Sequence, residues 1–112
     1  MEIEVTLFGN VARVKLRGRL DTPGVDRIEQ KFTAAVVPDR HNTVVDLSEV
    51  SFIASMGLRM FIGLAKALKR QNAKLVLFAP QSQVNEVFTT VLLRDIVPVV
   101  ADEAEAIRIA AV

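Results

Sequence analysis

A short apolar run near the middle of the chain constrains the fold more than any other feature. Residues 43–47 read Thr-Val-Val-Asp-Leu, with the single acid Asp46 among apolar and β-branched residues. A strand with one face in solvent alternates polar and apolar residues, whereas a strand covered on both faces is almost entirely apolar. Residues 74–79, Lys-Leu-Val-Leu-Phe-Ala, repeat this pattern. The two runs predict interior strands of a sheet that carries other elements on both faces.

The rest of the chain supplies the outer strands and the helices. Alternating residues flank Gly9-Asn10, which predicts a hairpin. The first helix is expected to have Thr22 as its N-cap, to start at Pro23 and to end before Pro38. We therefore expect one α/β domain, residues 1–112, with a mixed sheet of four to five strands and about four helices packed against it. The expected strands are 2–8, 11–16, 43–47, 74–79 and 96–100, and the later helices run over 55–70, follow Pro80 and follow an Asp102 cap.

Composition excludes several classes of function. A chain of 112 residues is one domain, and 14 basic against 13 acidic residues leave no basic footprint for nucleic acid. The absence of Cys and the single histidine, His41, exclude disulfides, thiolate chemistry and multi-histidine metal sites. No apolar stretch approaches the roughly 20 residues that span a bilayer. We expect a cytoplasmic domain with no metal or cofactor and no contact with nucleic acid or membrane.

The sequence contains no recognisable catalytic constellation. It has no glycine-rich phosphate loop and no Gly-x-Ser-x-Gly elbow. His41 stands between Arg40 and Asn42 in a polar loop, where a solvated surface residue is expected and not a base. No carboxylate has an evident acid–base partner. The sequence therefore predicts a protein that is not an enzyme.

Functional chemistry is expected at Ser55. A strand ending near Leu47, a short loop and then Ser55-Met-Gly-Leu would place Ser55 at a helix start, as its N-cap. Free backbone amides and the positive helix end favour a phosphate there, and the hydroxyl can accept a phosphoryl group. Gly57 would let another backbone approach closely. The alternative from spacing alone is that Ser55 only caps the helix.

A stripe of small and apolar residues continues from this position along the predicted helix. Met56, Met60, Gly63 and Ala67 recur at helical spacing on the outer side, where charged residues would be expected. We interpret them as a protein-docking strip next to Ser55. The open alternative is that loops or a neighbouring helix cover the two methionines. The expected core face consists of Leu58, Phe61, Ile62, Ala65 and Leu68.

Residues 44–48 and 52–58 together resemble the signature of STAS domains, the anti-sigma-factor antagonist family. Gly18-Arg19-Leu20-Asp21 after the second strand supports the resemblance, which covers nearly the whole chain. It implies a non-enzymatic phospho-switch. In such proteins the unphosphorylated form binds an anti-sigma factor that is also a serine kinase, and so releases the kinase's target to regulate transcription. Phosphorylation of one serine ends the binding, and a serine phosphatase of the metal-dependent class resets it.

The family motif usually reads Asp-Ser-Ser/Thr-Gly-Leu, and this chain departs from it twice. The resemblance makes Ser55 the phosphoacceptor, whereas Ala54 replaces the acid and Met56 the second hydroxyl. It also implies that two acids at strand ends lie near the site. Two alternatives stay open: a constitutive, non-phosphorylated STAS adaptor subunit of a lipid-transport or signalling complex, and a small enzyme or nucleotide-binding module. The expected partner-binding residues are Asp21, Asp46, Ala54, Met56, Gly57, Met60, Gly63 and Ala67.

Overall fold

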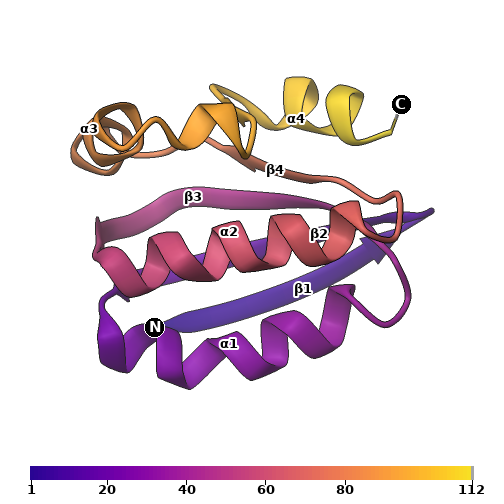
Figure 1. The fold of residues 1–112 in the computed structure, drawn as a ribbon, viewed down its shortest axis with the longest axis horizontal. Coiled ribbons are helices and arrows are strands. Elements are labelled where there is room, and N and C mark those ends of the chain that lie inside the picture. Colours follow the sequence, from indigo (N-terminus) through magenta and orange to yellow (C-terminus); the bar gives the residue numbers. More distant parts are fainter. Residues whose placement is uncertain (112) are drawn as a thin grey trace.

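A five-stranded mixed sheet forms the centre of the structure (Figure 1). The structure is a computed structural model that describes residues 1–111, apart from the side chain of Phe8. The strands lie in the sheet in the order in which they occur in the chain, β1-β2-β3-β4-β5. Strands β1 and β2 form the expected antiparallel hairpin, and every later pair is parallel. The strands are β1 Glu2–Phe8, β2 Val11–Leu20, β3 Asn42–Ile53, β4 Leu75–Phe78 and β5 Val99–Val100.

Helices lie on both faces of the sheet. Helices α1 and α2 lie side by side on one face, and α4 packs on the other, with α3 beyond the end of β4 (Figure 1). This architecture confirms the expected α/β class with its mixed sheet and four helices. The helices are α1 Thr22–Val36, α2 Ser55–Lys69, α3 Ser82–Thr90 and α4 Glu103–Ala110, with a 3₁₀ turn η1 at Leu93–Asp95.

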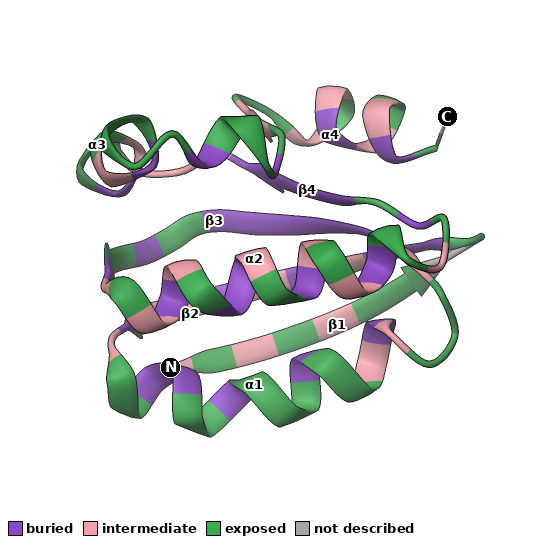
Figure 2. Ribbon diagram, viewed as in Figure 1, coloured by how far each residue is buried: buried purple, intermediate pink, exposed green. Residues whose placement is uncertain are grey.

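Strand β3 is the interior strand that its apolar run predicts. Residues 43–47 are all buried, and Figure 2 shows the long buried part of this strand. Val45 and Leu47 contribute to the core on the α1–α2 face, whereas Val44 joins the smaller core beneath α4. The alternation follows from the pleat, which sends successive side chains to opposite faces. The near-continuous apolar run is therefore explained by helices on both sides.

The prediction that this strand ends near Leu47 is wrong, because β3 continues to Ile53. Ser48, Glu49 and Ser51 look like loop residues in sequence, but the segment pairs with the equally extended second half of β2. Gly18 pairs with Val50 beside an irregularity in the register. Pairing with a distant strand has overridden local polarity here.

Two local predictions are corrected as well. Asp21, and not Thr22, caps α1, since its side chain is the one that accepts from the helix, at Gly24 N, 2.9 Å. His41 is only 16% exposed and has its Nε2 3.9 Å from a carboxylate oxygen of Asp39, so it is not the fully solvated residue expected. Its backbone N–H donates to the carbonyl of Val36, which holds the loop against the end of α1.

Candidate functional site

The candidate site lies where β2 and β3 end next to each other. The two strands are parallel and Leu20 pairs with Ile53, so both chains leave the sheet at the same edge. The N–H of Ala54 donates to the carbonyl of Leu20 over 2.9 Å, which continues the ladder by one bond. Helices α1 and α2 begin immediately afterwards. The topology therefore brings the Gly18–Asp21 and Ile53–Leu58 segments together, as the resemblance implies.

Helix α2 starts without a side-chain cap. Ala54 is the N-cap, in extended conformation, and its methyl group cannot accept a hydrogen bond. Ser55 is the first helical residue and is exposed, so the expectation that its hydroxyl caps the helix is wrong. The first turn contains no acidic residue. The positive N-terminal end of α2 is thus open to solvent beside an exposed hydroxyl, and this combination is favourable for a phosphate.

Gly57 is required for the close packing of α2 on the sheet. A Cβ at this position would lie 2.8 Å from Cγ1 of Ile53, 3.1 Å from Cβ of Leu20 and 3.2 Å from the Leu20 carbonyl oxygen. The predicted close backbone approach is confirmed, and the approaching backbone is this chain's own β2. Gly57 is buried, so it positions Ser55 from beneath.

Asp21 lies at the same edge and is partly exposed, at 34% of its side chain. The backbone N–H of Gly24 and, after it, the guanidinium of Arg19 lower the pKa of the Asp21 carboxyl, against the smaller opposing effect of desolvation. The carboxylate is therefore ionised at neutral pH. Asp21 holds α1 in place and also adds a fixed negative charge to the edge next to Ser55.

Arg19 and Phe52 belong to this surface, although sequence reasoning did not select them. The guanidinium carbon of Arg19 lies 4.3 Å from the centroid of the Phe52 ring, and its Nε lies 3.3 Å from Oδ2 of Asp21. Phe52 is 37% exposed. The available signal was position, since both residues stand inside the motifs that carry the resemblance. A cation stacked on an exposed ring is a common recognition element.

The predicted docking strip is not an exposed stripe. Met60 is 2% exposed and belongs to the main core, while Met56 and Ala67 are half-buried and Gly63 is exposed. Helix α1 runs alongside α2 on the same face of the sheet, so α2 buries one side against a helix and another against strands (Figure 1). The alternative interpretation, in which a neighbouring helix covers Met56 and Met60, therefore explains why these two residues are apolar.

The core face of α2 is correspondingly wider than expected. Its buried residues include Leu64, which the sequence analysis omitted, whereas Leu58, Ile62 and Ala65 are only partly buried. The buried residues of the helix are Gly57, Met60, Phe61, Leu64 and Leu68.

Asp46 is not brought together with Ser55. It lies in the middle of β3, on the α4 face of the sheet, and the residue is 5% exposed. Burial raises the pKa of its carboxyl, but the Ser48 N–H at 2.9 Å and the nearby charges of Arg13 and Lys15 outweigh this, so the pKa is lowered. The expectation of a strand-end acid at the site is wrong, because β3 is longer than predicted. Asp46 joins strands β2 and β3 to each other.

The surroundings of the site are otherwise polar. An open depression of about 390 Å³ borders Asp21 between the end of β2 and the start of α1. Arg19 and Arg27 contribute its positive charge. Within residues 1–111, no three or more histidine or carboxylate groups gather in a way that could hold a metal ion. None of the helices described is both long and apolar enough to cross a membrane. The arrangement offers an exposed hydroxyl at a helix start without a side-chain cap, beside a surface that carries Arg19, Asp21 and Phe52.

Comparison with known proteins identifies the family. The model of the STAS domain matches residues 2–106. An anti-sigma-B factor antagonist of Staphylococcus aureus is 28% identical over 99 residues, which cover 88% of this chain and 92% of that protein. Two solved structures share the fold. The anti-sigma factor antagonist from Mycobacterium paratuberculosis has a TM-score of 0.88 at 22% identity, covering 99% of this chain and 94% of that one. The phosphorylated form of the Bacillus cell fate determinant SpoIIAA has a TM-score of 0.72 at 22% identity, covering 96% and 97%. The chain belongs to the STAS domain family.

Proposed function

We propose that this chain is an anti-sigma factor antagonist controlled by phosphorylation of Ser55. Unphosphorylated, it binds an anti-sigma factor that is also a serine kinase, and so frees the target of that factor. The observation that carries the proposal is the exposed hydroxyl of Ser55 on the first residue of an uncapped helix, at an edge shared with Asp21. The names of the curated relatives and the existence of a phosphorylated SpoIIAA structure support it. The protein itself is a non-enzymatic regulator.

Electrostatics explains how one phosphate ends the binding. Phosphorylation adds about −1.5 to −2 charges, which changes the chain's net charge of +1 to a negative value. The new charge lies at the same edge as the ionised Asp21 and next to the half-buried Met56. A partner seated there would have to desolvate the phosphate without neutralising it. Such burial costs several kcal/mol, and each 1.4 kcal/mol weakens binding tenfold.

The helix end favours the phosphorylated state within the free protein. The unsatisfied amides of the first turn and the positive end of the helix dipole stabilise an anion at Ser55. Ala54 places no like charge beside it, in contrast to the acid of the family motif. The phosphate is therefore tolerated in the free chain and unfavourable at the interface. A serine phosphatase of the metal-dependent class would restore binding.

The first experiment is intact-mass analysis with peptide mapping after incubation with ATP and lysate of the source organism. We expect a single phosphate on Ser55, absent from Ser55→Ala. Ser51→Ala is the matched control, because Ser51 is also exposed and lies four residues earlier on the same edge. In pull-downs, Ser55→Ala should retain the anti-sigma factor and Ser55→Asp should lose it. Equal binding by the two variants would contradict the electrostatic account.

A constitutive STAS adaptor is the second candidate, and Ala54 is the observation that favours it. The acid beside the acceptor serine is absent, which removes a group that could order the loop or position a kinase. An adaptor would stay unmodified in the mass measurement and would still capture a partner. Both Ser55→Ala and Ser55→Asp would then bind like the original chain.

A further inference from the structure

Every charged side chain of helix α2 is a cation. The helix contains Arg59, Lys66 and Lys69 but no aspartate or glutamate. On an exposed helix surface, acids three or four positions from basic residues form stabilising pairs with them. Helix α2 offers no such acid, and Arg59 also forms no ion pair, side-chain hydrogen bond or ring contact with any other residue of the range 1–111. Its exposed guanidinium is therefore uncommitted in the unphosphorylated protein.

Arg59 lies one helical turn after Ser55. Residues i and i+4 of a helix are neighbours on its surface, with their Cβ atoms about 5–6 Å apart. Because helical side chains lean toward the N-terminus, a residue at i+4 covers the turn that starts at residue i. Both residues are exposed. An acid four positions before a base is also the more favourable order of such a pair, so the position suits a cation whose partner is an anion on Ser55.

The other arginines near this edge are engaged or lie elsewhere. Arg19 Nε is 3.3 Å from a carboxylate oxygen of Asp21, and its guanidinium stacks on an aromatic ring. Arg27 borders the depression that also contains the residue preceding β1, on the β1 side of β2. Ser55 follows β3, which lies on the opposite side of β2. Arg59 is therefore the guanidinium best placed to reach a group on this serine.

The polar side chains around Ser55 already have partners. Asp21 accepts from the first turn of α1 at 2.9 Å and pairs with Arg19. The start of α3 brings the neutral side chains of Gln81 and Gln83 to β3, where their amides donate to backbone carbonyls. A phosphate on Ser55 would supply the acidic partner that α2 lacks.

We infer that Arg59 is the internal counter-ion of a phosphate on Ser55, an inference that rests on the phosphorylation proposed above. A guanidinium binds two phosphate oxygens at once, and such charge-assisted hydrogen bonds are stronger than neutral ones. The free amides of the first turn bind the same group. Arg59 thereby stabilises the phosphorylated form of the free protein.

This pair does not cancel the electrostatic switch. A phosphate brings about two negative charges, so one guanidinium leaves about one of them. The edge changes from a free positive charge at Arg59 to about one net negative charge at the edge that carries Asp21. A partner that binds the unphosphorylated edge meets the cation, whereas a partner that approaches the phosphorylated edge meets the anion.

The test uses the full chain with phosphoserine introduced at position 55 during translation. Phosphorus NMR follows the binding of the second proton to the phosphate, which occurs near a pH of about 6. A nearby cation favours the dianion, so Arg59 should lower the pKa of this step. Arg59→Gln should therefore increase the proton affinity of the phosphate about twofold, and Arg59→Lys, which keeps the charge, should restore most of the difference. The Nε–Hε resonance of Arg59 should also move when Ser55 is phosphorylated.

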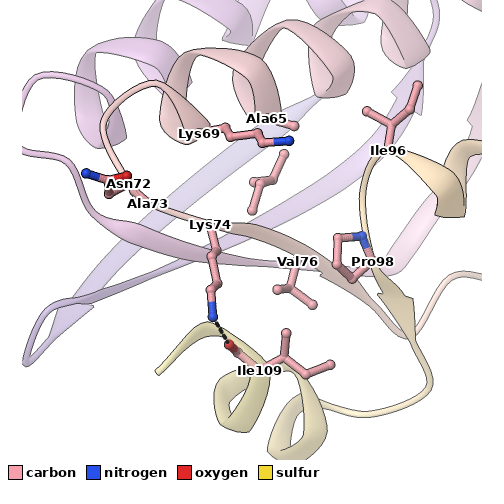
Figure 3. Close-up of a pocket in the computed structure, with 10 residues that line it drawn as sticks. Ala65, Lys69, Asn72, Ala73, Lys74, Val76, Ile96, Pro98 and Ile109 are labelled. Atoms are coloured by element: carbon pink, nitrogen blue, oxygen red, sulfur yellow. Dashed lines mark hydrogen bonds between the residues drawn. The ribbon is translucent and has the colours of Figure 1, made fainter. Parts of the chain in front are cut away.

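Two controls remove a positive charge elsewhere. Arg27→Gln is the same exchange at the same edge, and Lys69→Gln neutralises a cation at the far end of α2, about 20 Å away. Figure 3 shows Lys69 beside the open groove that Ile96 and Pro98 border. Exposed charges farther apart than about 8 Å are largely screened at physiological salt, so each control should change the proton affinity by less than about 1.2-fold.

Three results would overturn the inference. The first is equal proton affinity of the phosphate in Arg59→Gln and in the original chain. The second is an effect of Arg27→Gln as large as that of Arg59→Gln, because the phosphate would then respond to net charge and not to one pair. The third is an Nε–Hε resonance of Arg59 that phosphorylation leaves unchanged. Because the phosphoserine is introduced during translation, none of these results depends on a kinase, whereas failure of the proposed switch would appear as an unmodified Ser55 in the mass analysis.

Discussion

Replacing Ala54 by Asp should stabilise the protein, because α2 lacks a side-chain cap. Ala54 already has the extended conformation of an N-cap, with φ −108° and ψ 178°, so an aspartate there needs no change in the backbone. The N–H of Gly57 is already bonded to the Ala54 carbonyl at 3.0 Å. The amide of Met56 is the donor that the new carboxylate would satisfy. The substitution therefore adds one charge-assisted hydrogen bond and a favourable interaction with the helix dipole.

The expected gain is about 1 kcal/mol. Replacing alanine by a good N-cap residue stabilises a helix by about 0.5–2 kcal/mol. The negative charge of an acid at the helix start stabilises it by about 0.3–1 kcal/mol. Ala54 is half-buried, so partial desolvation of the carboxylate keeps the sum near the middle of this range. For a chain of 112 residues the unfolding entropy is about 0.24 kcal/mol per kelvin, which converts the gain to a rise in Tm of about 4 °C.

Thermal unfolding followed by circular dichroism at pH 7 measures this gain. Ala54→Asn is the matched variant, since it can cap without charge and should retain about half of the rise. The cap bond and the helix dipole lower the folded pKa of the new carboxyl, so the advantage of Asp over Asn should be complete above the unfolded value of about 3.9 and should be lost as the pH falls below it. As the reciprocal control, Asp21→Ala removes the existing cap bond to Gly24 and should lower Tm by a similar amount. An Ala54→Asp variant no more stable than the original chain would refute the view that α2 starts with unsatisfied amides.

Four further substitutions test the packing of α2 and the ion pair of Asp46 by chemical denaturation. Gly57→Ala should cost about 1–3 kcal/mol of stability, because the added Cβ would lie 2.8 Å from a side-chain carbon of Ile53. Gly63→Ala should gain about 0.5–1 kcal/mol, because its added Cβ would meet no neighbouring group within 4 Å. Equal effects of the two substitutions would show that α2 can shift on the sheet. Met60→Ala should cost about 2–5 kcal/mol of stability, because the Met60 side chain is in the core. A loss below about 1 kcal/mol would support the original interpretation of Met60 as part of an exposed docking strip. Asp46→Asn should cost about 2 kcal/mol at pH 7. Since the folded pKa of Asp46 is lowered, its contribution is complete above the unfolded value near 3.9 and is lost as the pH falls below it, so a pH-independent difference would contradict the ion pair.

The regular elements could be predicted from sequence because their signals are local. The turn at Gly9-Asn10, the proline that precludes a longer α1 and the Asp102 cap of α4 each act within a few residues, and all three are confirmed. The second half of β3 could not be predicted in this way. Its stability depends on pairing with residues more than 30 positions earlier in the chain. An exposed polar residue such as Glu49 is equally common in a paired strand and in a loop, so its identity does not distinguish the two.

The candidate site shows the same division. The position of Ser55 at a helix start follows from the sequence, and the close approach at Gly57 follows from the absence of a side chain. The burial of Met60 could not be predicted in this way. The sequence of a helix shows which of its faces are apolar, but it does not show which of these faces a second helix covers. Asp46 was misplaced for a related reason. An acid in an apolar strand is compatible with a functional edge or with an internal ion pair, and only the register with Arg13 and Lys15 distinguishes them.

The agreement between the order of the strands in the sheet and their order in the chain has a consequence for synthesis. Each new strand joins the edge formed by the strand made before it, so β2, β3, β4 and β5 find their partners already present as the chain leaves the ribosome. No strand must be inserted between two others, and after β1 no strand must wait for a later partner before it can pair. The edge that receives the next strand is at every stage that of the most recent strand. The sheet can therefore assemble in the direction of translation, and the shortness of β5 ends this growth.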